Sequence, residues 1–355
     1  MMVRIFRISL VLLAMFSICG SRVGHAEDCT PLGDLNFICG IKGPEDLAVL
    51  PGNRWLIASG EDIGSGLHLV DIAEKSSQRW IASSTKAVSQ IYRDCDEAPA
   101  PDKFKAHGIS LRTLGSGKAT LYVVNHGGRE AIEVFEVDLQ GQRPNLTWLG
   151  CVAMPAGLAG NSVASAPDGA IFVTVMLHPG TTLADLFDRR PTGAVYRWHP
   201  GDPGFTRIWG TELAGNNGID LSPDGKTMYV AATGTQSVTA FSTTNPTTVL
   251  YRIQMPGFSP DNIHWSDGRL VAAGMKVDEP ACGGAIKVVN GKVDGTNCPR
   301  GYVVATIDPK NMRVAVLARG PATPGYTGVA TGLPVGNTLW LGSFVADRLA
   351  YRVMP

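Results

Sequence analysis

The chain has 355 residues, of which 44% are hydrophobic, and it carries equal numbers of basic and acidic residues, 31 of each. A large core can therefore form, and the lack of a basic excess argues against a nucleic-acid-binding protein. The length would allow two domains, although all-β propellers and barrels of this size often form one.

The first 26 residues have the pattern of a secretory signal peptide. Arg4 and Arg7 precede the short apolar run ISLVLLAMFSICG, and the segment ends in VGHA, with the small residue Ala26 last. We predict cleavage after Ala26 and a secreted or periplasmic mature chain, 27–355. An uncleaved anchor is the alternative, although the run is short for a membrane span and no later segment resembles one.

The mature chain would retain six of the seven cysteines, and an even number favours disulfides in an exported protein. The natural local pairs are Cys29–Cys39 and Cys282–Cys298, which leaves Cys95–Cys151. The sequence leaves this connectivity open, and no C-x-x-C spacing supports a zinc or redox site.

A turn rich in Gly, Asp or Asn followed by a short apolar strand recurs along the chain. The copies are 51-PGNRWLIASG, 115-GSGKATLYVVNHG, 167-PDGAIFVTV, 223-PDGKTMYVAA, 266-SDGRLVAAG and 336-GNTLWLGSF. Hairpin units repeated at this spacing predict an all-β fold, a single six-bladed β-propeller with a central channel. A β-sandwich with an extra domain is the alternative. The long irregular segments 84–105 and 276–300 are expected to cover the channel mouth.

Polar residues lead into several of the predicted inner strands, whose starts would converge on the channel. The oxygen-bearing members of this set are Glu45, Asn161, Asn217, Asp261 and Asn262. Two carboxylates and three amides suit calcium, which prefers six to eight oxygen ligands, and the absence of sulfur argues against zinc or copper. Each residue also has an ordinary interpretation, because acids and N-G steps are common in turns.

Several stretches resemble the paraoxonase family of calcium-dependent six-bladed propellers. They are GPEDLAVLP, HGIS, LYVVNHGG, AIEVFEVDL, NGIDLSPDGKTMYVA and DNI, although gluconolactonases and strictosidine synthase-like propellers carry turns related to the NG and SPDG steps. The resemblance implies that the five oxygen-bearing residues hold a catalytic calcium. It also implies that His107 and His126 activate water, and that Asp46 with the carbonyl of Ile109 belongs to a second, structural calcium site.

The chain departs from the family pattern in four ways. Met275 and Lys276 stand where the family usually has a histidine after the fifth-blade strand. Ser162 stands where the family usually has Asp, which weakens the second calcium site, and no cysteine after Cys298 can tie the chain ends together. Blade closure must therefore depend on strand pairing. The long amphipathic helices of animal members are not evident.

We therefore predict a monomeric, calcium-dependent arylesterase or lactonase that acts on a small ester or lactone. His107 would be the general base with His126 as its partner, although Asp261 or Glu45 at the metal could also activate water. A sugar lactonase of the gluconolactonase type is one alternative, and a non-catalytic binding propeller with structural calcium is the other. The histidines His68, His178, His199 and His264 are expected to be ordinary surface or packing residues.

Overall fold

The computed structural model describes residues 29–354 apart from 83, 86–89, 116, 245, 246 and 295–297. The predicted signal peptide lies outside the described residues, so its cleavage stays a prediction. None of the helices among the described residues has the length and apolar character that crossing a membrane would require.

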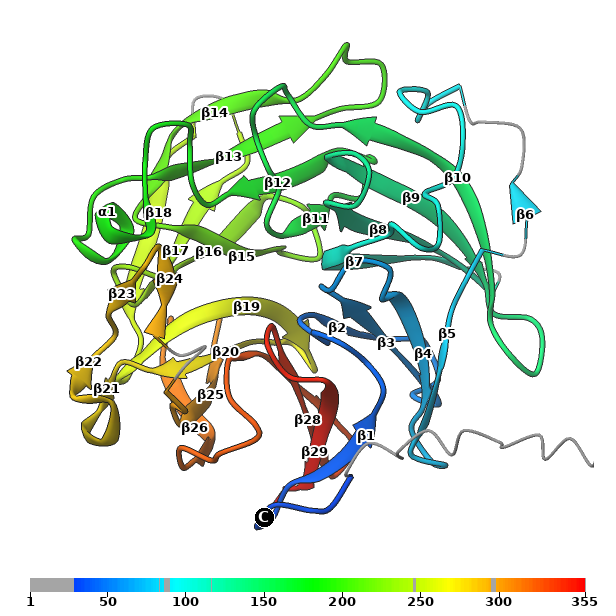
Figure 1. The fold of residues 1–355 in the computed structure, drawn as a ribbon. Coiled ribbons are helices and arrows are strands. Elements are labelled where there is room, and N and C mark those ends of the chain that lie inside the picture. The colour runs from blue at the N-terminus through cyan, green and yellow to red at the C-terminus, as the bar shows by residue number, and fades with distance from the viewer. Residues whose placement is uncertain are drawn as a thin grey trace, which may run out of the picture.

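The structure is a ring of six antiparallel blades, as predicted (Figure 1). Blade 1 contains β2 (Leu47–Val49), β3 (Trp55–Gly60), β4 (Gly66–Asp71) and β5 (Ser76–Arg79). Blade 2 contains β7 (Ala106–Gly115), β8 (Lys118–Asn125), β9 (Ala131–Asp138) and β10 (Asn145–Ala153), with the short parallel β6 (Ser84–Thr85) beside β10. Blade 3 contains β11 (Val163–Ser165), β12 (Ile171–Val175), β13 (Gly193–Trp198) and β14 (Thr206–Leu213).

The second half of the chain forms the remaining blades in the same order. Blade 4 contains β15 (Asn216–Leu221), β16 (Thr227–Ala232), β17 (Ser237–Ser242) and β18 (Val249–Gln254). Blade 5 contains β19 (Phe258–Ser266), β20 (Arg269–Lys276), β25 (Tyr302–Ile307) and β26 (Val314–Gly320). Blade 6 contains β27 (Val329–Val335), β28 (Thr338–Ser343), β29 (Arg348–Val353) and the N-terminal β1 (Asn36–Cys39).

The repeated sequence unit is the hairpin from the inner strand of each blade into its second strand. Between β19 and β20, Asp267 and Gly268 both have positive φ, at 48° and 75°. Two such residues in succession make the tight turn that joins antiparallel strands, and the D-G step favours it. The six copies therefore mark one hairpin per blade, which is why their number predicted the number of blades.

Strand pairing between the two ends of the described chain closes the ring. β1 pairs antiparallel with β29, with Asn36 opposite Tyr351 and Cys39 opposite Arg348. A disulfide joins Cys29 to Cys39 and so ties the segment before β1 to the end of that strand. Closure by pairing without a long end-to-end disulfide agrees with the prediction.

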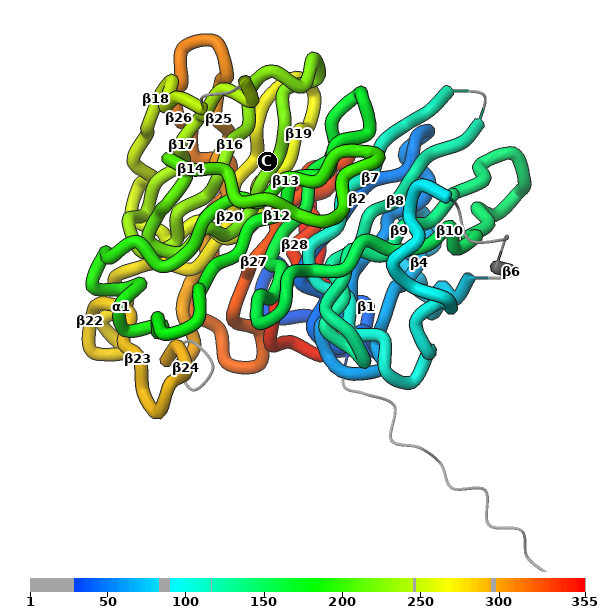
Figure 2. The backbone as a smooth tube through the Cα atoms, turned by 90° about the horizontal axis from the view of Figure 1, so that it is seen from above, coloured from blue at the N-terminus to red at the C-terminus, as the bar shows by residue number. Residues whose placement is uncertain are grey.

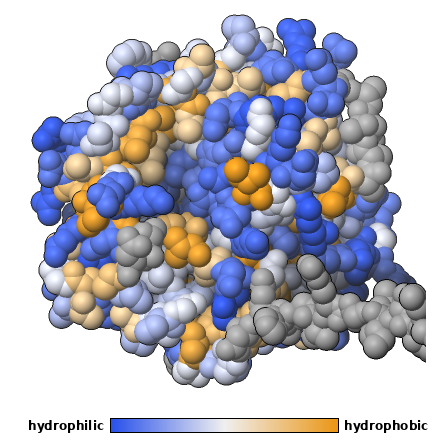
Figure 3. Space-filling model, in the orientation of Figure 1, coloured by the Kyte–Doolittle hydropathy of each residue, from blue (hydrophilic) through white to orange (hydrophobic). Residues whose placement is uncertain are grey.

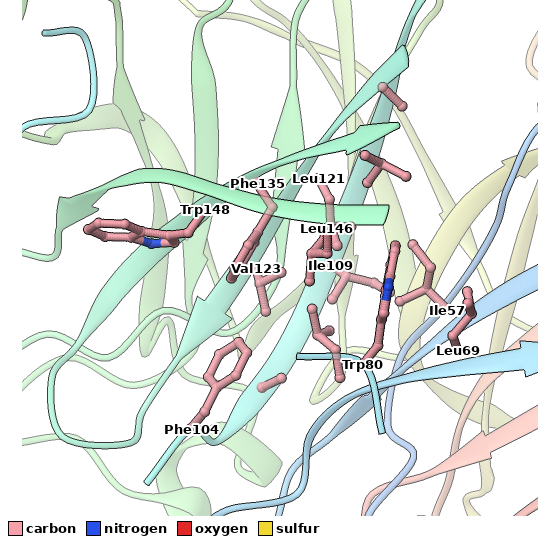
Figure 4. Packing of buried hydrophobic residues seen from close by; sticks show 14 of the residues in the cluster. Ile57, Leu69, Trp80, Phe104, Ile109, Leu121, Val123, Phe135, Leu146 and Trp148 are labelled. Carbon is pink, nitrogen blue, oxygen red and sulfur yellow. The ribbon is translucent and has the colours of Figure 1, made fainter. Parts of the chain in front are cut away.

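The hydrophobic core lies between neighbouring blades. Figure 4 shows Leu121 and Phe135 of blade 2 in one cluster with Ile57 and Leu69 of blade 1. Fully burying a side chain of this kind contributes about 1.5–3 kcal/mol, so each blade is stabilised mainly by its neighbours. Two further disulfides, Cys95–Cys151 and Cys282–Cys298, complete the expected pairing.

Two excursions from the blades lie on one side of the ring (Figures 1 and 2). The first carries the short helix α1 (Leu183–Phe187), which begins with a capping box between Thr182 and Asp185. The second, residues 278–294, is called the cap below. It contains β21 (Asp278–Glu279), the 3-10 turn η1 (Pro280–Cys282), β22 (Gly284–Ala285), β23 (Val288–Val289) and β24 (Lys292–Val293).

Candidate functional site

A pocket of about 270 Å³ opens at one end of the channel, and polar side chains from five consecutive blades line part of it. These are Glu45 before β2, His107 in β7, Asn161 before β11, Asn217 in β15 and Asp261 in β19. The five residues were predicted to meet here, and they do, although they span more than half of the chain.

The inner strands are irregular where these side chains occur. The pairing register shifts between Ala106 and Ile109, between Asn216 and Ile219, and between Pro260 and Ile263. A bulge inserts an unpaired residue and re-aims side chains, and bulges are common beside functional sites. His107, Asn217 and Asp261 each fall inside one of these irregular stretches, so the bulges explain how a short strand presents a polar residue to the pocket.

Two glycines in the bulges allow neighbouring inner strands to approach closely. A Cβ atom on Gly108 would lie 2.6 Å from the backbone oxygen of Asn161, and one on Gly218 would lie 2.5 Å from that of Asp261. Only glycine fits at such separations. The H-G and N-G steps in the sequence therefore hold site residues of adjacent blades together.

The carboxylate of Glu45 is buried and only half satisfied. Glu45 is 2% exposed, its Oε1 accepts a 2.6 Å hydrogen bond from Asn262 Nδ2, and its Oε2 has no partner among the described residues. Burial, with the negative charges of Asp46 and Asp261, raises the pKa of Glu45 well above its ordinary value. A cation at the free oxygen would favour the ionised form of this carboxylate.

Asn217 and Asp261 present further oxygens to the pocket from adjacent blades. Asn217 Nδ2 donates to Thr233 Oγ1 at 3.1 Å, while the buried Asn217 Oδ1 has no partner in the described part of the chain. Burial raises the pKa of Asp261 to about 7, and the amide of Asn217 lowers it in part. Both residues thus have oxygen atoms whose environment would be stabilised by a positive charge.

His107 belongs to a hydrogen-bonded chain that runs from the pocket toward the surface. His107 Nδ1 lies 2.9 Å from His126 Nε2, and His126 Nδ1 lies 2.8 Å from Glu130 Oε2. An ionised carboxylate only accepts, so His126 donates from Nδ1 and its Nε2 accepts from His107 Nδ1. This assignment leaves a lone pair on His107 Nε2, which lies 3.7 Å from Glu45 Oε1. Burial, together with His126, lowers the pKa of His107 well below its ordinary value.

The structure places Asn262 behind Glu45 and not in the pocket lining. Its amide Nδ2 donates to Glu45 Oε1, and also to Thr331 Oγ1 at 2.9 Å. Thr331 in turn donates to the backbone oxygen of Glu45 at 2.8 Å. Asn262 therefore orients the carboxylate of Glu45 through its nitrogen, and its predicted role as a calcium ligand stays a prediction.

Hydrogen bonds hold the carboxylate of Asp46, the residue predicted with the carbonyl of Ile109 for a second calcium site. Asp46 is fully buried, and its Oδ1 lies 2.5 Å from His264 Nε2, while its Oδ2 accepts from the backbone N–H of Ile109 at 2.8 Å. Oδ1 also accepts from the N–H of Leu47, and Thr331 Oγ1 lies 3.1 Å from it. Both oxygens already have donors, so a second ion there would compete with these hydrogen bonds, and that site stays a prediction.

His264 was expected to be an ordinary surface or packing histidine, and its ring contacts the buried carboxylate of Asp46. Burial alone would lower the pKa of His264, but the carboxylates of Asp46 and Asp220 outweigh it and raise the pKa. The ring of His264 thus contacts Asp46 where the resemblance implied a metal ion, and this carboxylate favours the charged form of the imidazole. The two-residue spacing from Asn262 along β19 could have suggested this position, since residues two apart share a face of a strand.

Several pocket residues were missed in the sequence. Each directly follows the second strand of its blade, and they are Glu61, Met176, Thr233 and Phe344. His126 occupies the same place after β8, so an alignment of the copies at their strand ends would have found them. Segment 84–105 was expected at the mouth, but its described residues do not line this pocket. Residues 97–101 and Phe104 instead border a separate depression beside Trp80.

The residues present fit a single hard cation. Among the residues that the structure describes, no three His, Cys, Asp or Glu side chains are grouped as a metal site. A cation would therefore depend on the amide oxygens of Asn161 and Asn217 as well as on Glu45 and Asp261. Such an all-oxygen set of low net charge is typical of calcium.

Known proteins share this architecture. A putative gluconolactonase has 16% sequence identity over 92% of this chain and 94% of its own, with a TM-score of 0.52. A luciferin-regenerating enzyme has 13% identity over 89% of this chain and 92% of its own, also with a TM-score of 0.52. A calcium-binding protein, regucalcin, from Agrobacterium tumefaciens has 12% identity over 89% and 91%, with a TM-score of 0.50. Identities this low support the fold alone.

The sequence itself matches a family. No curated protein matches the chain significantly. The sequence model of the SMP-30/Gluconolactonase/LRE-like region matches residues 61–298, which cover blades 2 to 4, the last two strands of blade 1 and the first two strands of blade 5. The paraoxonase resemblance points to related propellers but stays a prediction. The chain belongs to the SMP-30/gluconolactonase/LRE-like family.

Proposed function

We propose that the chain is a calcium-dependent hydrolase of small carboxylic esters or lactones. The observation that carries the proposal is the buried carboxylate of Glu45, whose Oε2 has no partner among the described residues, beside the similarly free Asn217 Oδ1. Uncompensated oxygens of this kind are costly unless an ion or a ligand satisfies them. A cavity of about 270 Å³ suits a small substrate.

The residues divide the chemistry between them. Glu45, Asn161, Asn217 and Asp261 would hold the cation, which supplies a positive charge for the oxygen that becomes negative when an ester carbonyl is attacked. His107 Nε2 would take the proton of the attacking water, because its neighbours leave the lone pair there. The imidazolium formed at His107 would then be stabilised through His126 by the carboxylate of Glu130.

The test is hydrolysis of phenyl acetate, unsubstituted and alkyl γ-lactones and sugar lactones, each with calcium and with a chelator. We expect turnover that chelation removes and calcium restores. Turnover that is equally fast in chelator would contradict the metal role. Absence of turnover on every substrate, with calcium binding retained, would favour a non-catalytic binding propeller.

Hydrolysis of a sugar lactone is the second candidate, and the family match favours it. The two candidates differ in their need for His107 and His126. If a sugar lactone is the best substrate and His107→Gln leaves its turnover unchanged, the gluconolactonase-type function holds and the histidine mechanism fails.

We also propose that the protein is exported and monomeric. Three disulfides support an oxidising compartment, in which such bonds persist. Sizing of the secreted protein and sequencing of its N-terminus would test both statements. A mature N-terminus other than Glu27 would overturn the predicted cleavage site.

A further inference from the structure

The outer part of the pocket is apolar, in contrast to the polar residues from the inner strands. The apolar lining comes from α1, from the cap and from the residue after β28, and comprises Leu183, Leu186, Phe187, Ile286, Val293 and Phe344. The space-filling view shows a hollow in this face that hydrophobic as well as hydrophilic residues border (Figure 3). Lys292 also lines the pocket, but it is exposed, so its ammonium group can stay in water.

One buried arginine fixes the cap to the propeller. Arg300 lies two residues before β25 of blade 5 and is 1% exposed. Its guanidinium donates to both carboxylate oxygens of Asp294, at 3.0 and 2.8 Å, in the bidentate manner that gives geometric specificity. It also donates to the backbone oxygens of Val277, Gly284 and Ala285, each at 3.0 Å. One side chain therefore holds the residue directly before the cap, the middle of the cap and its last residue.

Two more contacts limit movement of the cap. The disulfide Cys282–Cys298 ties its first turn to the chain that returns to blade 5, and Glu279 Oε2 accepts from the N–H of Gly301 at 3.2 Å. Within the cap, Ile286 is partly buried toward the pocket, whereas Val289 is 47% exposed. The cap thus has one face that meets the pocket and another that meets solvent.

We propose that the cap, held by Arg300, is the substrate-selecting element of the pocket and receives an apolar substituent of the ester or lactone. This rests on the proposed function. The hydroxyl groups of a sugar lactone would face Ile286, Val293 and Phe187 without hydrogen-bond partners, which is unfavourable. An alkyl or aryl group placed there would instead remove apolar surface from water. The inner-strand residues bind the reacting carbonyl, and the cap distinguishes what is attached to it.

Binding of γ-lactams tests the proposal independently of turnover, because a lactam keeps the ring and carbonyl of a lactone but resists hydrolysis. With the calcium-loaded protein, calorimetry should show that a hexyl-substituted γ-lactam binds at least about tenfold more tightly than unsubstituted γ-butyrolactam. The double variant Ile286→Ser, Val293→Ser should lose about tenfold of this preference and leave the binding of unsubstituted lactam unchanged. Val289→Ser is the matched control on the exposed face of the cap and should keep the preference.

Arg300→Met tests the anchor. With alkyl and unsubstituted γ-lactones as substrates, the variant should raise KM for the alkyl lactone by about tenfold and leave kcat and the KM of the unsubstituted lactone nearly unchanged. If Arg300→Met fails to fold, Arg300→Lys, which keeps the charge but loses the bidentate fork, takes its place.

The outcomes separate the two proposals. If the protein hydrolyses no lactone but still prefers the hexyl-substituted γ-lactam, the proposed function is contradicted and the role of the cap is supported. A hexyl preference that is absent, or unchanged in the Ile286→Ser, Val293→Ser variant, overturns the role of the cap whether or not the protein hydrolyses lactones.

Discussion

Asn216 and Asn217 are adjacent in β15 but face different surroundings. Asn216 is fully buried, accepts from the N–H of Leu213 at 3.0 Å and donates to the backbone oxygen of Thr211 at 2.8 Å. Asn217 directs an unpartnered oxygen to the pocket. We therefore expect Asn216 to stabilise the fold and Asn217 to bind the cation, although the two are adjacent in one strand.

Substituting each asparagine by alanine should give opposite results. Asn217→Ala should lose calcium affinity and turnover while the apo protein largely keeps its thermal stability, because Thr233 Oγ1, which accepts from Asn217, still donates to the backbone oxygen of Pro260. Asn216→Ala should retain calcium binding but lose about 1–3 kcal/mol of stability, since two buried backbone groups lose their partner. Calcium titration and urea unfolding of both variants check this, and near-normal turnover of Asn217→Ala would contradict the metal model.

Substitution of Glu130, which lies outside the pocket lining, tests the hydrogen-bonded chain of His107 and His126. Glu130→Leu removes the acceptor that directs the proton of His126 to Nδ1, and with it the tautomer that leaves His107 Nε2 free. We expect kcat to fall by about tenfold to a hundredfold with KM little changed. His199→Gln, on an exposed histidine beside Asp168, is the control. A Glu130→Leu enzyme with an unaltered pH profile of kcat would show that Glu130 does not act through the histidines.

The sequence predicted which residues meet at the pocket better than how they are arranged. Glu45, His107, Asn161, Asn217 and Asp261 could be found because each precedes or begins an inner strand, and a propeller brings such positions together. The direction of a side chain depends on bulges and on neighbours from other blades, which the sequence does not reveal. Asn262 and His264 lie in the same strand as Asp261, yet one contacts Glu45 and the other contacts Asp46.

Among the elements, hairpins were predicted well and excursions were not. A turn with a D-G or G-N step and an apolar strand carry a local signal, so one copy of the unit marked each blade. Helix α1 has five residues, and the strands of the cap have two each, which is too short for any periodicity to show. Their positions depend on tertiary contacts such as those of Arg300.

β1 closes the ring, and removal of its disulfide tests how much that closure contributes. The double variant Cys29→Ser, Cys39→Ser should lose about 2–3 kcal/mol, the range expected for a short closed loop. Cys282→Ser with Cys298→Ser is the comparison, because that disulfide lies in the excursion and not in the closing blade. This second variant should increase cleavage of the cap by protease but lower the free energy of unfolding of the whole chain only slightly. Equal losses of global stability in the two variants would contradict this division.

At the scale of the whole molecule, the pocket carboxylates link stability to pH. The unfolded chain releases the protons of Glu45 and Asp261 near roughly pH 4, whereas folded Asp261 holds its proton to about pH 7 and Glu45 holds its own well above the ordinary value. The folded apo protein thus binds more protons, so its stability falls as pH rises through this range. Below about pH 6.5 the lowered pKa of His107 acts in the opposite direction.

We therefore expect apo-protein stability to fall between pH 6.5 and 8, by at most about 1.4 kcal/mol per pH unit for each proton. Calcium should flatten the slope, because the cation favours the ionised carboxylates. The raised pKa of His264 also makes stability fall with rising pH, both with calcium and with chelator. The difference between the two slopes therefore reports the pocket carboxylates alone. Urea unfolding with calcium and with chelator measures it, and Asp261→Asn should reduce the apo slope. Parallel slopes in calcium and chelator would exclude a cation at these carboxylates.

Closure of the ring has a consequence for the time at which the calcium pocket forms during synthesis. Thr331 and Asn262 contact Glu45 across 286 and 217 residues of sequence, so the surroundings of Glu45 exist only in the completed ring. A nascent or translocating chain lacks them until its last blade has emerged. In a protein proposed to be exported, the calcium pocket therefore forms only after the last blade has been synthesised, and no shorter N-terminal fragment carries the assembled pocket.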